Sequence, residues 1–287
     1  MKVTLSCSRI RKIARQMFRG HWAGAFLAVF ICAVLVNGPG YIVYYLSGSR
    51  TASTIVELYT VFVTGPLTLG LSNYFLNVFR GTAELGMGSL TERGPYLLSG
   101  VALYVTEMIL VIMWSFLLVV PGIIAAIRYS QAFYVLADEP DMNPFDCIRQ
   151  SNRLMLGNKG KYLLLLLSYL PWLILASIPA GIVRSNLVGS AAVYDVAGLE
   201  ALLSRLSAAS MHPAVILLSV LTLFVQVYVM AGTVCFYDLA NGSLVVEHGD
   251  VTYEGYIADS VDRYEITGFE SKYKDQQEDR DETQGLH

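Results

Sequence analysis

The chain has little charge for its length. Only 15% of its 287 residues are Asp, Glu, Lys or Arg, whereas 54% are hydrophobic and the mean hydropathy is +0.50. Soluble domains carry about 25% charged residues, so this scarcity argues against one or two soluble domains. The apolar residues gather in long blocks, and several reach the roughly 20 residues that a helix needs to cross a bilayer core about 30 Å thick.

Cysteine and histidine are also scarce. Cys7, Cys32, Cys147 and Cys235 are scattered without a CxxC pair, and the four histidines lie far apart, so neither a zinc site nor a disulfide framework is indicated. We interpret the cysteines as small apolar packing residues. The sequence also lacks a Walker loop, an HExxH or GxSxG motif and a carboxylate-rich metal motif. We therefore expect no catalytic residues, no metal and no cofactor.

Residues 1–20 are predicted to form a basic amphipathic helix. Ile10, Ile13, Ala14, Met17 and Phe18 share one face at helical spacing. A helix of this kind lies in the headgroup layer with its cations over anionic lipid, which explains the basic residues better than nucleic acid does. The alternative is a helix packed on the protein's own cytoplasmic loops. The cations expected to contact lipid headgroups are Arg9, Arg11, Lys12, Arg15 and Arg19.

Residues 21–240 are predicted to form an all-α, polytopic bundle of about six transmembrane helices. The loop 138–161 contains a short cytoplasmic helix, with Asn143 as N-cap and Pro144 at the first helical position. The repeated leucines of 199–206 predict a small amphipathic helix in the connection between the last two spans. Whether the short fourth span crosses fully stays open. The spans are expected at approximately 21–47, 55–79, 100–120, 123–137, 162–183 and 213–238.

The distribution of Lys and Arg predicts that both ends lie in the cytoplasm. With the N-terminus inside, the inner segments 1–20, 80–99 and 138–161 hold twelve Lys and Arg, and the outer loops hold three. Cytoplasmic loops carry such an excess. Residues 241–287, with 12 acidic and 4 basic side chains, are predicted to be a largely disordered cytoplasmic tail. The tail either recruits a basic cytoplasmic protein or is a solvated end, and we favour the second interpretation.

Glu107 and Arg128 are two charges well inside apolar runs, where an ionisable group is costly enough to suggest a functional site. One interpretation is an ion pair between spans three and four, although helical rise separates the two residues by about 10 Å in depth. In the alternative interpretation each side chain reaches an interface, or Arg128 bonds a backbone carbonyl. Both interpretations stay open from the sequence.

Three Gly-Pro or Pro-Gly pairs are predicted to interrupt helices. Gly38-Pro39 and Gly65-Pro66 would break spans one and two at similar depth, and Pro121-Gly122 would turn the hairpin between spans three and four. Many transporters expose backbone groups to substrate at broken helices, and Asn73 and Asn77 would then line a cavity. Alternatively the pairs are plain kinks, and the asparagines bond neighbouring helices.

A family resemblance rests on short stretches in spans two to six: Gly65-Pro66-Leu67 with Gly70, Tyr74-Phe75-Leu76, Arg80-Gly81, Pro121-Gly122-Ile123, Tyr129-Ser130, Leu136-Ala137-Asp138, Pro140, Ser151, Leu154-Met155, Gly157, Lys159, Trp172 and Phe236-Tyr237. At these stretches the chain resembles a bacterial family of six-span membrane proteins known only as domain of unknown function 975. A looser resemblance is to the membrane region attached to some glycerophosphodiester phosphodiesterases, but no phosphodiesterase catalytic portion is present. The resemblance implies a bacterial cytoplasmic membrane location and no assigned activity. The long connection between spans five and six and the acidic tail depart from the family pattern.

These residues are compatible with three classes of function. The favoured hypothesis is a non-enzymatic membrane scaffold or assembly factor that holds the basic helix and the acidic tail on one cytoplasmic face. The second is a small-solute transporter or channel built around the interrupted helices of spans one and two. An intramembrane enzyme is least favoured, because it would need paired catalytic groups at one depth.

Overall fold

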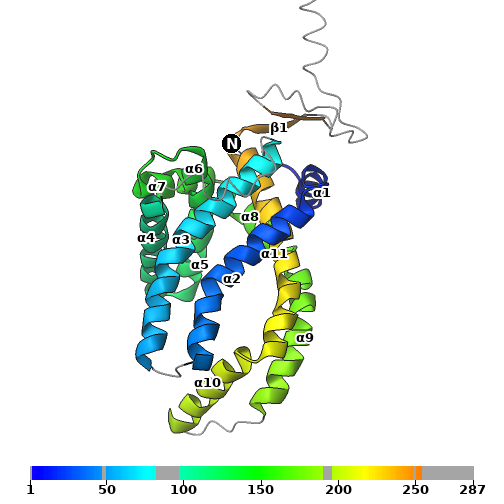
Figure 1. Cartoon of the computed structure of the whole chain (residues 1–287). Helices are drawn as coiled ribbons and strands as arrows, with labels where there is room; N and C mark the ends of the chain where they lie inside the picture. Colours follow the sequence, from blue (N-terminus) through cyan, green and yellow to red (C-terminus); the bar gives the residue numbers. More distant parts are fainter. Residues whose placement is uncertain (1, 47–49, 82–96, 190–195, 248–249, 254–287) are drawn as a thin grey trace, which may run out of the picture.

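Helices dominate the part of the chain that the computed structural model describes, which is residues 2–46, 50–81, 97–189, 196–247 and 250–253. They form an elongated bundle with α1 at one end and α10 at the other (Figure 1), and we call these the α1 end and the α10 end. In chain order the elements are α1 (Cys7–Met17), α2 (Trp22–Leu46), α3 (Arg50–Arg80), α4 (Leu97–Leu117), α5 (Val119–Tyr129), α6 (Ala132–Asp138), α7 (Pro144–Leu154), α8 (Lys159–Leu167), α9 (Leu170–Val188), α10 (Val196–Ser210), α11 (Pro213–Asn241), β1 (Leu244–Glu247) and β2 (Asp250–Tyr253).

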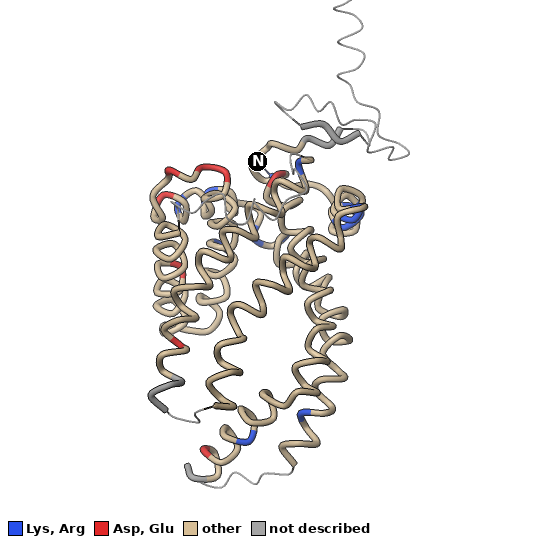
Figure 2. Tube along the Cα trace, viewed as in Figure 1, with Lys and Arg blue, Asp and Glu red and all other residues tan. Residues whose placement is uncertain are grey.

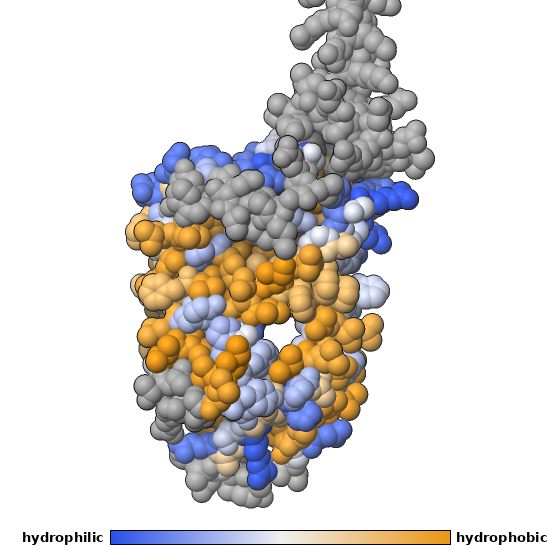
Figure 3. All heavy atoms as spheres, viewed as in Figure 1, coloured by the Kyte–Doolittle hydropathy of each residue, from blue (hydrophilic) through white to orange (hydrophobic). Residues whose placement is uncertain are grey.

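Six segments of the described chain are long and apolar enough to cross a membrane, which confirms the predicted polytopic helical bundle. Apolar residues cover the middle of the molecule, and hydrophilic residues lie toward its two ends (Figure 3). The fourth segment combines α5 and α6, and the fifth combines α8 and α9. The six segments are Trp22–Leu46, Thr54–Arg80, Leu97–Leu117, Val119–Asp138, Lys159–Val188 and Pro213–Asn241.

The fourth segment differs from the others in its burial. Within the most apolar window of each segment, 56% of the residues are buried for Val119–Asp138, against 11–17% for the other five. The other five segments are therefore mostly exposed, and large exposed apolar surfaces are typical of regions that face a membrane or a partner. The part of the fourth segment formed by α6 therefore lies inside the bundle, whereas Val119, Val120 and Ile123 at the start of α5 are exposed.

The start of α4 lies beside the middle of α3. An added Cβ at Gly65 would lie 2.5 Å from the carbonyl oxygen of Gly100, the fourth residue of α4. By helical rise, Gly65 is about 22 Å along α3 from Arg80. Two facing glycines allow this close backbone approach. The start of α4 therefore packs against the middle of α3 and not against its C-terminal end.

Two turns outside the apolar segments follow the local sequence signals. Pro144 opens α7 with Asn143 at the N-cap position, and Gly157 has a positive φ of 79° shortly after the helix ends, as a glycine at a helix end permits. The predicted short helix in residues 138–161 is thus present. The amphipathic helix expected around residues 199–206 corresponds to α10.

An antiparallel hairpin follows α11. Gly242, at φ 89°, ends the helix in the left-handed conformation, and β1 then pairs with β2 so that Leu244 lies opposite Tyr253. Leu244 is buried in the core of the bundle. The assignment of all of 241–287 to a largely disordered tail missed this hairpin, although Leu244-Val245-Val246 and Val251-Thr252-Tyr253 favour strands by composition. Residues 254–287 lie outside the described part of the chain.

Candidate functional site

Charged side chains from three apolar segments meet at the α1 end. The Arg80 Nη1 lies 2.5 Å from Asp138 Oδ1, and its Nη2 lies 2.6 Å from Asp238 Oδ1. The guanidinium also donates to the second oxygen of each carboxylate, at 3.0 Å and 3.3 Å. The Tyr237 hydroxyl donates to Asp138 Oδ2 at 2.7 Å. We call these four residues the Arg80 cluster.

The helix ends that hold these side chains explain why they need one another. Arg80 is the last residue of α3, Asp138 is the last of α6, and Asp238 lies in the final turn of α11. The C-terminal end of a helix carries partial negative charge, which favours the arginine and disfavours both aspartates. The forked guanidinium donors offset the two carboxylates at once. The Arg80 cluster therefore joins α3, α6 and α11.

Burial makes this pairing obligatory. The side chain of Asp238 is 0% exposed, while those of Arg80 and Asp138 are 25% and 20% exposed. A buried carboxylate is tolerated only when it is paired and hydrogen-bonded. Within the described residues no group of three or more His, Cys, Asp and Glu side chains could hold a metal ion. The geometry of the Arg80 cluster is that of an interhelical ion-pair network.

A second polar group lies at the break between α5 and α6. The Gln131 side chain is fully buried, its Nε2 donates to Ser130 Oγ at 3.1 Å, and its Oε1 has no donor. The hydroxyl of Tyr162 lies near the polar side chains of Ser130, Gln131 and Thr233. We call these four residues the Gln131 cluster. Its Gln131 oxygen is a hydrogen-bond acceptor without a donor inside the bundle, and leaving a buried acceptor without a donor costs folding free energy.

The break itself is closed by α7. The backbone N–H of Gln131 donates to Ser151 Oγ at 3.2 Å, and Ser151 in turn donates to the carbonyl oxygen of Arg128 at 2.8 Å. Backbone groups freed by a break inside an apolar bundle need such partners. The fourth span is therefore two short helices held by a side chain from outside the apolar segments.

The structure separates the residues of the predicted intramembrane polar site. Arg128 Nε donates to Asn152 Oδ1 of α7 at 2.8 Å, and among the described residues no ion pair joins Arg128 to Glu107. Glu107 is half-buried in α4, close enough to Tyr162 for its charge to act on that side chain. Asn73 is buried and Asn77 half-buried in α3.

The expected break at Gly38-Pro39 is absent, and this prediction is wrong. α2 continues through both residues. Proline at position 39 removes the N–H that would bond the carbonyl oxygen of Leu35, but the hydroxyl of Tyr59 from α3 donates to that oxygen at 2.8 Å. Satisfaction by a neighbouring helix is how membrane helices tolerate proline.

The other two expected breaks are also corrected. α3 continues through Gly65-Pro66, where the glycine permits the contact with Gly100. The turn between α4 and α5 falls at Leu118, whose backbone is extended, and Pro121-Gly122 lies inside α5. There Gly122 packs against Ser115 of α4, so its lack of a side chain serves packing rather than a turn.

The N-terminal helix is docked on the bundle. Ile10, Ala14 and Phe18 are fully buried, and Phe18 contacts the rings of Phe75 and Phe79 in α3. Four of the five predicted headgroup residues are exposed, namely Arg9, Lys12, Arg15 and Arg19.

Arg11 differs from the other four predicted headgroup residues. Its Nη1 donates to the carbonyl oxygen of Ser168 at 3.0 Å, and its guanidinium lies 6.0 Å from the ring centre of Tyr169. Ser168 caps the C-terminal end of α8, where a cation is favoured. Arg11 therefore joins α1 to the junction of α8 and α9.

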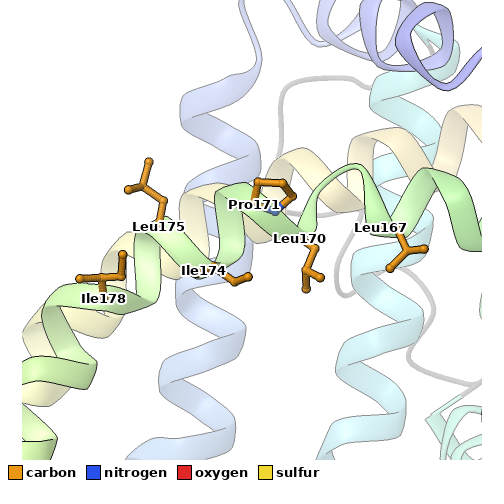
Figure 4. Close-up of a pocket in the computed structure, with 6 residues that line it drawn as sticks. All are labelled: Leu167, Leu170, Pro171, Ile174, Leu175 and Ile178. Atoms are coloured by element: carbon orange, nitrogen blue, oxygen red, sulfur yellow. The ribbon is translucent and has the colours of Figure 1, made fainter.

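An apolar groove runs along α8 and α9 (Figure 4). Its six lining side chains are all aliphatic or proline, so it holds no polar group that would fix a polar ligand. Such a surface suits hydrocarbon. The lining residues are Leu167, Leu170, Pro171, Ile174, Leu175 and Ile178.

Sequence reasoning missed the two clusters as sites. Arg80, Asp138 and Tyr237 enter the sequence analysis only as residues of the family resemblance, and Asp238 does not enter it. A usable signal was present, because each of the three charges lies at the end of an apolar block, where helix ends at one face of a bundle can meet.

Six membrane-length apolar helices and two polar clusters between them define a polytopic helical membrane protein of unknown activity. The sequence matches the family described as "Protein of unknown function (DUF975)" over residues 98–241, slightly more than half of its 287 residues. The chain belongs to this family. No curated protein and no solved structure matches it. The looser resemblance to the membrane region of glycerophosphodiester phosphodiesterases stays a prediction.

Proposed function

We propose that this protein is a non-enzymatic membrane scaffold that presents a fixed basic surface at its α1 end. The supporting observation is the docking of α1. Its apolar face is buried against the bundle, so the exposed cations of Arg9, Lys12, Arg15 and Arg19 stand on a rigid base. Lys and Arg are concentrated at the α1 end (Figure 2). A fixed row of cations suits anionic lipid headgroups or an acidic partner.

The same end of the bundle gives rise to the acidic tail. α1 packs against α11, and the chain leaves α11 toward residues 254–287 through the β1–β2 hairpin. We therefore propose that two segments of opposite charge, α1 and the acidic tail, lie on one face of the bundle. We also propose that the protein lies in a bacterial cytoplasmic membrane with both ends in the cytoplasm. The acidic tail would recruit a basic cytoplasmic protein, and no nucleic-acid partner is proposed.

Charge reversal on α1 tests the scaffold. Replacing Arg9, Lys12, Arg15 and Arg19 by glutamate should remove captured partners when the protein is crosslinked in its native membrane, because the cations no longer attract them. The matched control replaces the three arginines by lysine, which keeps the charge and should keep the partners. An identical set of captured molecules for both variants, each correctly inserted, would refute the proposal.

The tail needs a separate truncation. Removing all of 241–287 would expose core around the buried Leu244, so the suitable variant ends at residue 253. It should insert normally and lose the basic cytoplasmic partner. Unchanged capture would make the tail a solvated end and leave the α1 surface as the scaffold.

Transport of a small solute is the second candidate, and the Gln131 cluster favours it. A buried amide oxygen without a donor, in a membrane domain that also holds Glu107, would give a polar solute a binding group within the bundle. Flux into proteoliposomes should fall in Gln131→Leu and Glu107→Gln variants. Gly65→Leu is unsuitable, because its side chain would collide with the backbone of Gly100. Absence of flux for every solute tried would end this candidate.

A further inference from the structure

An opening passes through the molecule between α2 on one side and α9 and α11 on the other (Figures 1 and 3). Contacts close it at both ends. Toward the α1 end the rings of Phe26 and Phe224 stack with centroids 4.1 Å apart. At the α10 end the Tyr45 hydroxyl donates to the carbonyl oxygen of Met211 at 2.6 Å. By helical rise Phe26 and Tyr45 are about 28 Å apart along α2.

Two of the helices that border this opening, which we call the window, expose mainly apolar side chains between its closures. α2 exposes Val34 and the polar Asn37 there, and α11 exposes Leu217 and Leu221. Both helices belong to the membrane-length segments, so this stretch lies where hydrocarbon replaces water. Apolar surface at that depth is covered by lipid chains or by protein.

The closures at both ends favour a thin occupant. A transmembrane helix is about 10 Å wide with its side chains, and to occupy the window it would have to part either the Phe26–Phe224 stack or the Tyr45–Met211 bond. An acyl chain can enter from either face without disturbing these contacts. The geometry of a closed frame therefore selects hydrocarbon over a second copy of the chain.

Charge at the α10 end indicates the headgroup. Arg184 lies in the last turns of α9, and its Nε is buried without an acceptor. Arg205 lies in α10, which packs on α9. Arginine is well suited to bind phosphate oxygens with several donors at once. A phosphate at the end of the window would supply the acceptor that Arg184 lacks.

We infer that the window between α2 and α11 binds an anionic phospholipid. One acyl chain lies in the window, and the phosphate lies at Arg184. The lipid fills the frame that Phe26–Phe224 and Tyr45–Met211 close, and it thereby supports the stretch of α2 between these two contacts. The site is distinct from the basic surface of α1, because the two lie at opposite ends of the bundle.

Native mass spectrometry of the full chain, delipidated and then supplied with phosphatidylglycerol or phosphatidylcholine, tests this site. The unaltered protein should retain phosphatidylglycerol in preference. Val34→Trp with Leu221→Trp fills the window and should abolish retention of both lipids. The matched control is Leu98→Trp with Ile112→Trp, which places two tryptophans on exposed positions of α4 and should retain lipid normally. Equal retention by both double variants would overturn the proposal. A dimer of the unaltered protein that becomes a monomer in the window variant would also overturn it.

A second measurement covers the case in which the tryptophan variant fails to fold. Arg184→Gln should lower retention of phosphatidylglycerol about tenfold, the effect of losing a charge-assisted contact worth about 1.4 kcal/mol, and leave phosphatidylcholine unchanged. Phosphatidylglycerol with a photoactivatable acyl chain should crosslink to α2 and α11 of the unaltered protein within residues 27–44 and 214–223. Crosslinks equally frequent on α4, which does not border the window, would mean ordinary surrounding lipid and would refute the site.

Discussion

Arg80 contacts two carboxylates, and one of them, on Asp238, is fully buried. Arg80→Gln removes the guanidinium and leaves both carboxylates without their cation. Breaking a buried ion pair in this way typically lowers the free energy of unfolding by about 3–5 kcal/mol. Arg149→Gln breaks the Arg149–Asp146 pair, whose side chains are 66% and 46% exposed, and should cost less than about 1 kcal/mol. Thermal unfolding in detergent, followed by size-exclusion chromatography, should therefore show a far larger loss for the first variant.

The double variant Arg80→Gln, Asp238→Asn separates charge from packing. It leaves only Asp138, which is partly solvated, so it should recover part of the stability lost in Arg80→Gln. A double variant no more stable than the single one would mean that the stranded buried carboxylate is not the cause.

Cys147 in α7 tests burial outside the apolar segments. Its side chain is fully buried, and burial, followed by the charge of Asp146, raises the pKa of the thiol to about 11. The thiol is therefore protonated at neutral pH, and the reactive thiolate forms only as the pH approaches that value. In the folded protein a maleimide at pH 7.5 should label the half-exposed Cys7 and spare Cys147, Cys32 and Cys235. Labelling of Cys147 as fast as of Cys7 would contradict the structure.

At the scale of the helices, the bond from Tyr59 to the Leu35 carbonyl explains why α2 passes through Pro39. Tyr59→Phe should destabilise the protein by about 1 kcal/mol, the usual value for a hydrogen bond between membrane helices. In a Pro39→Ala background the N–H at position 39 donates to the carbonyl oxygen of Leu35. Tyr59→Phe should therefore lower the stability less in that background. Unfolding midpoints of the four proteins form a double-mutant cycle, and an unchanged cost of Tyr59→Phe would refute this role.

The elements themselves were predictable where the signal is local. Apolar blocks gave the six segments, and Asn143-Pro144 gave the start of α7. The continuity of α2 was not predictable, because the donor that rescues Leu35 comes from another helix. The Arg80 cluster was missed for the same reason: its partners lie 58 and 158 residues away in sequence, and no periodicity within one helix reveals that they meet.

At the scale of the whole molecule, the two ends of the bundle differ in charge. The segments assigned to the cytoplasm hold twelve Lys and Arg, including those of α1, against three in the segments at the α10 end. The basic end should stay in the cytoplasm, because segments rich in Lys and Arg are retained there during insertion. The α1 end is thus predicted to face the cytoplasm and the α10 end the opposite side.

Single cysteines in a cysteine-free chain measure this orientation, since Lys12 of α1 and Glu200 of α10 are both exposed and lie at opposite ends of the bundle. In intact cells a maleimide that cannot cross membranes should label Glu200→Cys and spare Lys12→Cys, and inverted vesicles should reverse the pattern. The opposite pattern in both preparations would invert the topology while leaving the bundle intact. Labelling of both positions from one side would place the two ends of the bundle in the same compartment, and the apolar segments could not then cross the membrane as the fold requires.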